Sequence, residues 1–359
     1  MNVMQNLAKQ DPRDTSFRAF QLPTDHPRVM GGKIGILVLN LGTPDGTDYW
    51  SMRRYLSEFL SDKRVIDWPA AVWQPILQGI ILSIRPSKKG KDYDTIWNHE
   101  KNEGPLLTIT RSQAEKLAAE LSLISGKIVV DFAMRYGNPA TGPAIEKLLK
   151  QGCDRILLLP MYPQYSVATT ATAADEAFRQ LMKMEWQPSI RVAPPWHDDT
   201  VYIDALAKSV RTHLATLNFK PEVLMASFHG VPKRYLTKGD PYHCQCVKTG
   251  RLLRETLDWP KDQYWQTFQS RFGPEQWLQP YTDKTVEELA KSGVKRLVMI
   301  APGFSADCLE TLEELDVENR EIFLHNGGEE FSYIPCLNDS DLGVSVMKTV
   351  ALRELAGWI

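Results

Sequence analysis

The sequence predicts an α/β fold of two similar Rossmann-like domains, each with a parallel sheet flanked by helices, around an active-site cleft between them. Buried-type strands alternate with helices, which is typical of parallel βαβ units. The pattern also restarts: AIEKLLKQGCDRILLLP, from Ala144, matches TVEELAKSGVKRLVMIA, from Thr285. FAMRYG and NLGTP likewise match FQSRFG and FHGVP. Such internal similarity indicates a duplicated unit, so we expect the strand ends of the two copies to face each other.

The composition bounds the class of protein. The 359 residues are 43% hydrophobic and 24% charged, which is ordinary for globular chains, and the formal net charge is −2. Nucleic-acid binding needs a strong basic excess, so it is not expected. Five cysteines, an odd number, fit a reducing compartment. No secretory signal or membrane-spanning run is visible, so we expect a cytoplasmic protein, with peripheral contact to the inner membrane left open.

The first half begins with a polar N-terminal arm, residues 1–32, followed by an expected N-terminal domain, 33–195. The apolar run 33–39 (KIGILVL) predicts a strand covered on both faces. The turn after it lacks the glycine pattern of a dinucleotide loop. Residues 48–61 predict a helix. The next expected elements are a helix at 106–123, strands at 127–133, 155–159 and 189–192, and helices at 143–150 and from 169.

The segment 65–84, VIDWPAAVWQPILQGIILSI, is apolar but interrupted by prolines and a glycine. One interpretation is a core helix followed by a solvated loop. The other is an exposed lip that rests on a membrane interface. A basic cluster that could face anionic headgroups or an anionic ligand follows it: Arg85, Lys88, Lys89 and Lys91.

The second half is expected to form a C-terminal domain over residues 196–340, with strands at 222–226, 263–269 and 295–300 and a helix at 285–292. The last 19 residues, 341–359, contain an amphipathic helix, 342–355, that we expect to pack back on the body. We place the domain boundary near Pro194 and Pro195.

Residues 301–314, APGFSADCLETLEE, follow the strand at 295–300. If a helix runs through them, Asp307, Glu310 and Glu314 stand at i, i+3 and i+7 and share one face. This face is either solvated or a row of carboxylates aimed into a cleft. The second interpretation is favoured because open α/β sheets bind ligands at the carboxyl ends of their strands.

His229 follows another buried strand and lies in the motif SFHGVP. A lone histidine is more often structural than catalytic. Facing a carboxylate row, however, it could accept protons near neutral pH. It could also join carboxylates in an open, weak site for a borderline divalent ion such as Fe²⁺.

Other strand ends carry aromatic and cationic side chains. Most single aromatics at such places belong to the core, but as a set they could wall a flat apolar ligand. Arginines and threonine hydroxyls could bind its carboxylates. The lone pair Cys244 and Cys246 is weak evidence for a metal cluster. The residues considered for the pocket are Trp68, Trp73, Arg85, Arg135, Tyr136, Tyr162, Tyr165, Thr169, Thr170, Arg271, Trp277 and Phe304.

With these residues in view, the sequence resembles the ferrochelatases, which insert ferrous iron into a porphyrin to make haem. The resemblance runs from about residue 33 to the C-terminal helix. It rests on several long motifs in one order: NLGTP at Asn40, YPQYS at Tyr162, SFHGVP at Ser227, KGDPYHCQC at Lys238, FQSRFGPEQWLQPYTD at Phe268 and APGFSADCLETLEELD at Ala301.

The resemblance implies that Fe²⁺ enters protoporphyrin IX and two protons leave. It implies metal ligation by His229 and Glu310, and a π-type distortion in the acidic helix. It also implies a porphyrin lip over about residues 49–91. The implied catalytic residues are His229, Glu310, Asp307 and Glu314. The implied substrate-binding residues are Leu41, Tyr55, Arg85, Tyr93, Arg135, Tyr136, Tyr162, Ser166, Trp277 and Phe304.

No tightly bound cofactor is expected. Some members of the family hold a [2Fe–2S] cluster through a cysteine-bearing C-terminal extension, whereas here Cys336 has no nearby cysteine partner and Cys153 stands alone. The expected partners are porphyrin, Fe²⁺ and a weakly contacted membrane surface at 65–91; oligomeric state stays open. Rival functions are a chelatase for another metal such as cobalt, or for coproporphyrin, and a non-catalytic tetrapyrrole carrier. A periplasmic-type binding protein would need a signal peptide.

Overall fold

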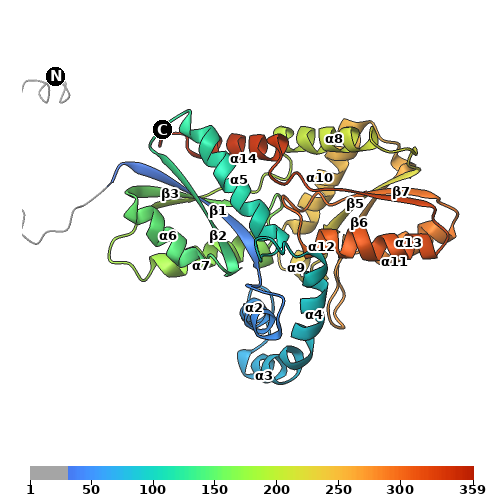
Figure 1. The fold of residues 1–359 in the computed structure, drawn as a ribbon, viewed down its shortest axis with the longest axis horizontal. Helices are drawn as coiled ribbons and strands as arrows, with labels where there is room; N and C mark the ends of the chain where they lie inside the picture. Colours follow the sequence, from blue (N-terminus) through green and yellow to red (C-terminus); the bar gives the residue numbers. More distant parts are fainter. Residues whose placement is uncertain (1–30) are drawn as a thin grey trace, which may run out of the picture.

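Two four-stranded parallel sheets form the frame of the molecule (Figure 1). The computed structural model describes residues 31–359, so residues 1–30 of the expected arm lie outside the described part. The first sheet has the order β2-β1-β3-β4 and the second β6-β5-β7-β8. Both orders place the first strand of the half between its second and third. The predicted fold class and its duplication are confirmed by this shared topology.

The strands carry the apolar runs noted above. In the first sheet Ile36 of β1 pairs with Val130 of β2 and Leu157 of β3, and in the second Met225 of β5 pairs with Met299 of β7. These central strands are covered on both faces, as continuous apolar runs require. The strands are β1 (Lys33–Thr43), β2 (Ile128–Gly137), β3 (Cys153–Pro160), β4 (Ser189–Val192), β5 (Val223–His229), β6 (Tyr264–Gln269), β7 (Arg296–Ile300) and β8 (Glu330–Ile334).

Helices cover both sheets and join them. The helices of the first half are α2 (Tyr49–Ser61), α3 (Ala70–Ile76), η1 (Leu77–Ile81), α4 (Leu82–Ile96), α5 (Pro105–Ser122), α6 (Thr141–Lys150), η2 (Val167–Ala171) and α7 (Thr172–Leu181). Those of the second half are α8 (Thr200–Leu214), α9 (Lys233–Thr237), α10 (Tyr242–Leu257), η3 (Lys261–Gln263), α11 (Thr282–Lys291), α12 (Leu309–Leu312), η4 (Glu314–Glu318), α13 (Asn319–His325) and α14 (Asp341–Glu354).

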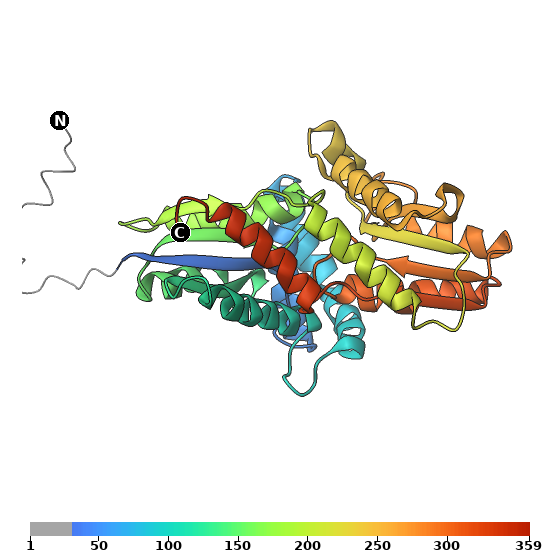
Figure 2. The same cartoon turned by 90° about the horizontal axis from the view of Figure 1, so that it is seen from above.

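The two halves share one core. A single cluster of buried apolar side chains contains Val38 and Leu159 from the first sheet together with Phe228 and Ile300 from the second. Side chains of α8 and α14 complete it, and Figure 2 shows these two helices side by side across the junction of the halves. Because apolar burial is continuous across the junction, we expect the halves to unfold together.

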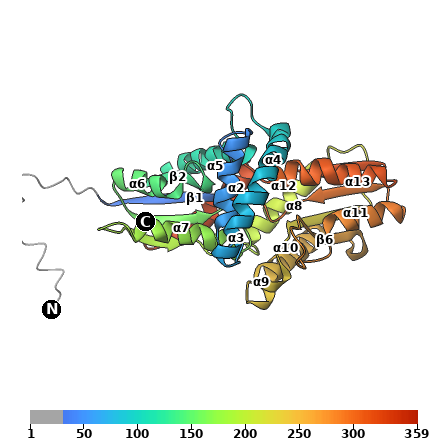
Figure 3. The same ribbon diagram turned by 90° about the horizontal axis from the view of Figure 1, so that it is seen from below.

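The lip (residues 49–91) leaves the first half between β1 and α5. Its helices α2, α3 and α4 project from the body in Figure 1, and Figure 3 shows them crossing the molecule between the two sheets. Trp73 and Leu82 are buried against Leu60, so part of the apolar run is a small core, as one of the two interpretations held. None of the helices in residues 31–359 has the length and apolar character needed to cross a bilayer.

Two sequence-based expectations about elements need correction or addition. No strand was predicted at β8, which pairs with β7 in parallel at the edge of the second sheet. The predicted helix through 307–314 is wrong in its first turn, because α12 begins only at Leu309 and Cys308 before it is extended, at φ −150° and ψ −169°. Asp307 therefore lies outside the helix and shares no helical face with Glu310.

Candidate active site

His229 is the last residue of β5, where the sheet ends and the chain turns. Its Nδ1 lies 2.6 Å from the carbonyl oxygen of Gly230. A carbonyl can only accept, so Nδ1 must carry the hydrogen of this bond and Nε2 keeps a free lone pair when the ring is neutral. The His229 carbonyl in turn accepts from the Tyr242 hydroxyl at 2.9 Å, which holds the turn in place. The half-buried ring faces Phe304, with 6.5 Å between ring centroids.

Glu314 opens η4 and reaches back to the end of β6. Its carboxylate accepts from the Ser270 backbone N–H at 2.8 Å, from the Ser270 hydroxyl, and from the Gln269 amide at 3.4 Å. Burial raises the pKa of Glu314, and the negative charge of Glu310 raises it further, while the Ser270 hydrogen bond and His229 lower it. Glu314 is thus within electrostatic range of both His229 and Glu310, and it can hold a proton above the usual range of a carboxyl group.

Glu310 connects this site to the lip. Its backbone carbonyl accepts from the Gln269 side chain at 2.6 Å. Burial raises the pKa of the Tyr55 and Tyr93 phenols, and the nearby Glu310 carboxylate raises both further. The carboxylate of Glu310 is therefore within electrostatic range of these two predicted pocket residues, which pack edge-to-face at 6.5 Å.

The structure does not bring Asp307 into this group. Its carboxylate is buried and accepts from Thr311 and Tyr333 at 2.9 Å each and from the Asn338 amide at 2.6 Å. The backbone N–H of Cys336 adds a longer contact at 3.4 Å. The predicted row of three carboxylates on one face is therefore wrong at its first member. Asp307 precedes α12, and both of its carboxylate oxygens are occupied by these hydrogen bonds.

Sequence reasoning missed two further acids, Glu313 and Glu318. Burial raises the pKa of Glu313 to about 7, the carboxylates of Glu318 and Asp92 raise it, and Lys89 of the lip lowers it. Lys89 itself is paired with Asp92 at 3.0 Å. The π-helical turn η4 adds a residue to the turn, so the regular helical spacing i, i+3, i+7 used to select the acids does not continue through it. The predicted π-type distortion is confirmed here.

Aromatic side chains line both sides of this region. On the C-terminal side, Trp277 donates through its indole N–H to the Phe272 carbonyl at 2.9 Å and packs over Gly230, beside His229. Arg85 of the lip stacks on the Phe272 ring at 4.1 Å, so the lip touches this loop. On the N-terminal side, a cluster with Tyr55, Tyr93 and Trp97 at its centre includes the predicted residue Leu41 and reaches Leu309 of α12.

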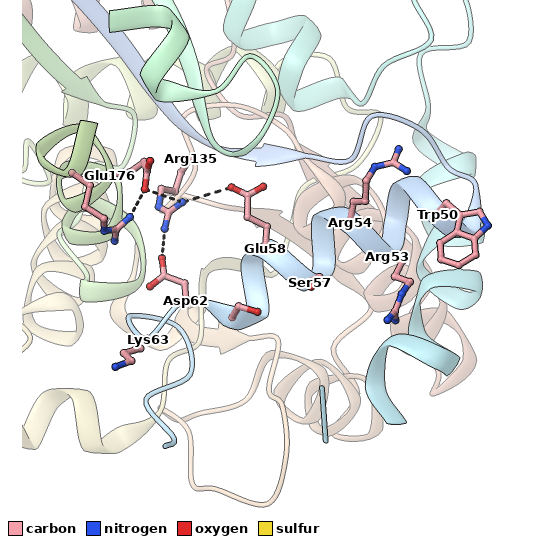
Figure 4. A pocket seen from close by; sticks show the side chains of 11 residues that line it. Trp50, Arg53, Arg54, Ser57, Glu58, Asp62, Lys63, Arg135 and Glu176 are labelled. Carbon is pink, nitrogen blue, oxygen red and sulfur yellow. Dashed lines mark hydrogen bonds and ion pairs between the residues drawn. The ribbon is translucent and has the colours of Figure 1, made fainter. Parts of the chain in front are cut away.

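Arg135 and Tyr136 both bind Asp62, the residue that follows α2. The Arg135 guanidinium is buried and donates to Thr172 and, at 2.5 Å, to Asp62; the Tyr136 hydroxyl also donates to Asp62, at 2.9 Å. Figure 4 shows Arg135 between Glu58, Asp62 and Glu176, on the wall of a cavity of about 820 Å³. In this structure Asp62 balances the charge of Arg135, and the predicted binding of a substrate carboxylate by Arg135 stays a prediction.

Tyr162 does present a free group. Its hydroxyl is buried and has no hydrogen-bond partner within residues 31–359. Burial raises the pKa of this phenol; Arg135 lowers it and Tyr55 raises it, so the hydroxyl is within electrostatic range of both residues. A buried hydroxyl without a partner is costly, and a bound ligand is one way to satisfy it.

Ser166, the other predicted residue of this motif, does not face the pocket. Its hydroxyl is buried, lies 3.2 Å from the Asp240 carboxylate and accepts from the Ala168 N–H at 3.3 Å. Asp240 also accepts from the Val167 N–H at 2.8 Å, so the carboxylate holds the start of η2. Ser166 thus links the two halves, and its predicted contact with substrate is not supported by this geometry.

The cysteines lie at scattered places. Cys244 is exposed, whereas Cys153, Cys246, Cys308 and Cys336 are buried free thiols. Within residues 31–359, no three histidine, cysteine, aspartate or glutamate side chains are close enough together to hold a metal ion.

Comparisons with known proteins point in one direction. The family model described as "Ferrochelatase" matches residues 33–355. A ferrochelatase of Allorhizobium ampelinum is 62% identical over 338 residues, covering 94% of this chain and 98% of its own. One of Agrobacterium fabrum is 61% identical over the same length, with the same coverage.

Among solved structures, "SirB from Bacillus subtilis with Fe3+" superposes with a TM-score of 0.53 at 12% identity, covering 90% of this chain and 96% of that one. A multi-domain protein of Deinococcus radiodurans, DR2241, described as structurally similar to chelatases, gives a TM-score of 0.50 at 11% identity and covers 89% of this chain and 55% of its own. At such identities these matches concern the fold alone.

Proposed function

The chain belongs to the ferrochelatase family, and from this premise we propose how its residues insert iron into porphyrin. As a ferrochelatase it is a lyase of the terminal step of haem biosynthesis, in which Fe²⁺ enters protoporphyrin IX and two pyrrole N–H protons are released. The chemistry therefore needs a proton acceptor near the macrocycle, acids that carry protons or iron, and walls that bind a rigid aromatic ring.

His229 is the proposed proton acceptor. The observation that carries this assignment is the 2.6 Å contact of Nδ1 with the Gly230 carbonyl, because it leaves Nε2 as the free acceptor. A lone pair on Nε2 can take a pyrrole proton or bind Fe²⁺, but it serves one partner at a time. We therefore propose that Glu310 and His229 together bind the approaching Fe²⁺ before the pyrrole nitrogens lose their protons. As the metal enters the ring, His229 is freed to accept a pyrrole proton.

Glu314 and Glu310 are proposed to carry the released protons away. Glu314 lies within electrostatic range of His229, and its raised pKa favours taking up a proton. Glu313 lies immediately before η4 and the exposed Glu318 ends it, which extends the acids toward solvent. Each proton taken from the macrocycle then leaves as a proton on a carboxyl group and finally on water, so charge and atoms balance.

The aromatic groups are proposed to bind and bend the macrocycle. Trp277 packs over Gly230 and Phe304 faces His229, while Tyr55 and Tyr93 are within electrostatic range of Glu310. A flat ring bound between these groups is proposed to hold its nitrogens near His229 and Glu310. Binding energy from these walls can be used to distort the porphyrin toward the reactive, puckered form. The unpartnered hydroxyl of Tyr162 is a further candidate contact, and Arg85 is the candidate partner for a porphyrin carboxylate.

We also propose that the lip rests on a membrane surface. Four large apolar side chains between residues 68 and 84 are exposed, namely Trp68, Val72, Ile80 and Ile84. Exposed lysines follow them at positions 88 and 91. This combination suits weak interfacial binding to anionic lipid, and with it a cytoplasmic enzyme held peripherally at the inner membrane.

Anaerobic mixing of the purified protein with protoporphyrin and Fe²⁺ tests the mechanism, with the visible bands followed over time. Catalytic replacement of free-base bands by haem bands is expected for the native chain and not for His229→Ala. Haem formation by the variant at a near-normal rate would contradict the role of His229. A shift of the bands at a stoichiometry of about one, without turnover, would instead mean that the porphyrin is bound but not metallated.

A further inference from the structure

The segment that follows His229, residues 230–238, lies between the lip and the loop 270–278 that carries Trp277. On the loop side it is held by backbone bonds. The Gly230 N–H donates to the Gln269 carbonyl at 2.7 Å, Lys233 N–H to Gln276 at 2.9 Å, and Leu278 N–H to Val231 at 3.0 Å. Pro232 also forms an isolated bridge with Trp277. The position of Trp277 is therefore coupled to the chain that leaves the histidine.

On the lip side the same segment is held by side chains of α9 and of the residue that follows it. The buried Tyr235 donates its hydroxyl to the carbonyls of Arg64 and Val65, at 3.1 Å each. Lys238 pairs with Asp67 at 2.9 Å. These contacts hold the irregular segment of the lip that joins α2 to α3.

Arg234 touches both sides. Its Nη1 lies 2.7 Å from the Asp67 carboxylate of the lip, and its Nε lies 2.6 Å from the Glu275 carboxylate of the Trp277 loop. Its side chain is 25% exposed, against 40% for Asp67 and 39% for Glu275, so the guanidinium is the more enclosed member of the group. The fork of the guanidinium suits two carboxylates at a set angle.

We infer that Arg234 is a positioning residue that sets the separation of the lip and the Trp277 loop, and so the tightness with which porphyrin is enclosed. The inference rests on the proposed function of these two walls. Arg234 itself touches no reacting atom. Half-exposed ion pairs contribute little individually, but two pairs on one guanidinium should change porphyrin affinity by about 3- to 10-fold.

The test compares Arg234→Met with the matched control Lys233→Met. Lys233 is the exposed neighbour, and its side chain forms no ion pair within residues 31–359. Free-base protoporphyrin binding is measured by quenching of tryptophan fluorescence, alongside KM and kcat for iron insertion. For Arg234→Met, we expect the porphyrin Kd and KM to rise by about 3- to 10-fold, with kcat within about twofold. Lys233→Met should match the native chain.

Three further measurements separate positioning from loss of fold. Arg234→Lys should fold and bind with intermediate affinity, because a lysine cannot span both carboxylates. Asp67→Asn should weaken binding in the native chain and have a smaller effect in Arg234→Met, where only the pair with Lys238 is left to lose. Raising the ionic strength should erase the difference in porphyrin affinity between the native chain and Arg234→Met.

The outcomes are distinguishable. If the native chain inserts iron and Arg234→Met binds porphyrin as tightly as Lys233→Met does, the positioning role is overturned and the proposed function stands. If the effects of Asp67→Asn and Arg234→Met on porphyrin affinity are simply additive, the proposed coupling of the lip to the Trp277 loop is likewise overturned. If the native chain inserts no iron, the proposed mechanism fails, and the binding comparison still decides the role of Arg234.

Discussion

A single carbonyl decides the chemistry available at His229. The Gly230 oxygen takes the Nδ1 hydrogen, so the free nitrogen is Nε2. Fixing the tautomer through an outer partner is a common way to prepare a histidine for proton transfer or metal binding. The β5 end supplies this geometry because the chain turns immediately after the histidine.

Replacement of His229 by alanine should reduce kcat for iron insertion by about 100-fold or more, since positioned proton transfer contributes on that order. Porphyrin binding should change little, because the aromatic walls remain. The measurement is single-turnover haem formation beside porphyrin fluorescence titration. His325→Ala is the matched control, because His325 is exposed and ends α13, outside the proposed site. A variant that loses porphyrin binding and activity together would indicate a structural histidine instead.

Asp307 and Glu310 should behave differently although they are three residues apart. Asp307→Asn turns an acceptor of several hydrogen bonds into a group with a competing donor, so it should lower the free energy of unfolding by about 2–3 kcal/mol. Glu310→Gln should leave unfolding nearly unchanged and lower kcat. Chemical denaturation and steady-state kinetics of both variants check this pair of expectations. A stable Asp307→Asn with much lower kcat would return Asp307 to the catalytic group.

At the scale of elements, the acidic segment combines a short helix and a π turn. α12 has only four residues before η4 changes the hydrogen-bonding pattern. Glu314, the first residue of η4, accepts from Ser270, whereas Glu313 before it is within electrostatic range of Lys89 and Asp92 of α4. Glu313 and Glu314 are consecutive, so a helical turn already directs their side chains apart.

Glu313 makes stability depend on pH. Its pKa is about 7 in the folded chain and 4.5 ordinarily, so between these values the unfolded chain releases a proton that the folded chain retains. Ionisation then favours unfolding, and stability falls as the pH rises through this window. Glu313→Gln cannot ionise, so it should melt about 1–2 °C above the native chain at pH 8 and show no gain below pH 4.5.

The measurement for this element is thermal melting across the pH range, with Glu321→Gln as the exposed control. A gain that is equal at pH 8 and at pH 4 would mean that the substitution acts through packing and not through charge.

Much of this architecture could be predicted because it depends on local pattern. Continuous apolar runs located the central strands, and the repeat of AIEKLLKQGCDRILLLP predicted the duplication. β8 escaped because an edge strand with the exposed Glu330 and half-buried Ser332 has no continuous apolar run. The row from Asp307 failed for a different reason: helix periodicity was applied across Cys308, where the backbone is extended.

Tertiary partners account for the remaining differences in the site. Nothing in the sequence near Arg135 shows that Asp62, from the end of α2, will bind it. In the same way Ser166 meets Asp240, which lies in the other half of the chain. Motif reasoning finds residues that belong to one region, but it cannot tell which of them point to the substrate and which to each other.

At the scale of the whole molecule, the shared core makes the two halves one body, and the lip is the part that stands out from it. Ile80 and Ile84 are 59% and 68% exposed and one helical turn apart. Exposed apolar side chains on a basic, projecting segment favour aggregation unless another surface covers them. The lip also borders the proposed porphyrin walls, so a bilayer under it would place the mouth of the site near an apolar phase.

The native chain should therefore sediment with anionic vesicles at low ionic strength and less so at high ionic strength. Replacing Ile80 and Ile84 together by serine should lower the partition coefficient by about 10-fold or more, since each side chain loses apolar burial worth about 1.5–3 kcal/mol at most. Leu123→Ser, at a site 82% exposed outside the lip, is the matched control. If the native chain stays in solution at low salt, or if Leu123→Ser reduces binding as much as the lip variant, the lip does not contact the membrane. If only the lip variant is released while its rate of iron insertion in solution is unchanged, the exposed face serves to hold the enzyme at the bilayer and takes no part in the chemistry.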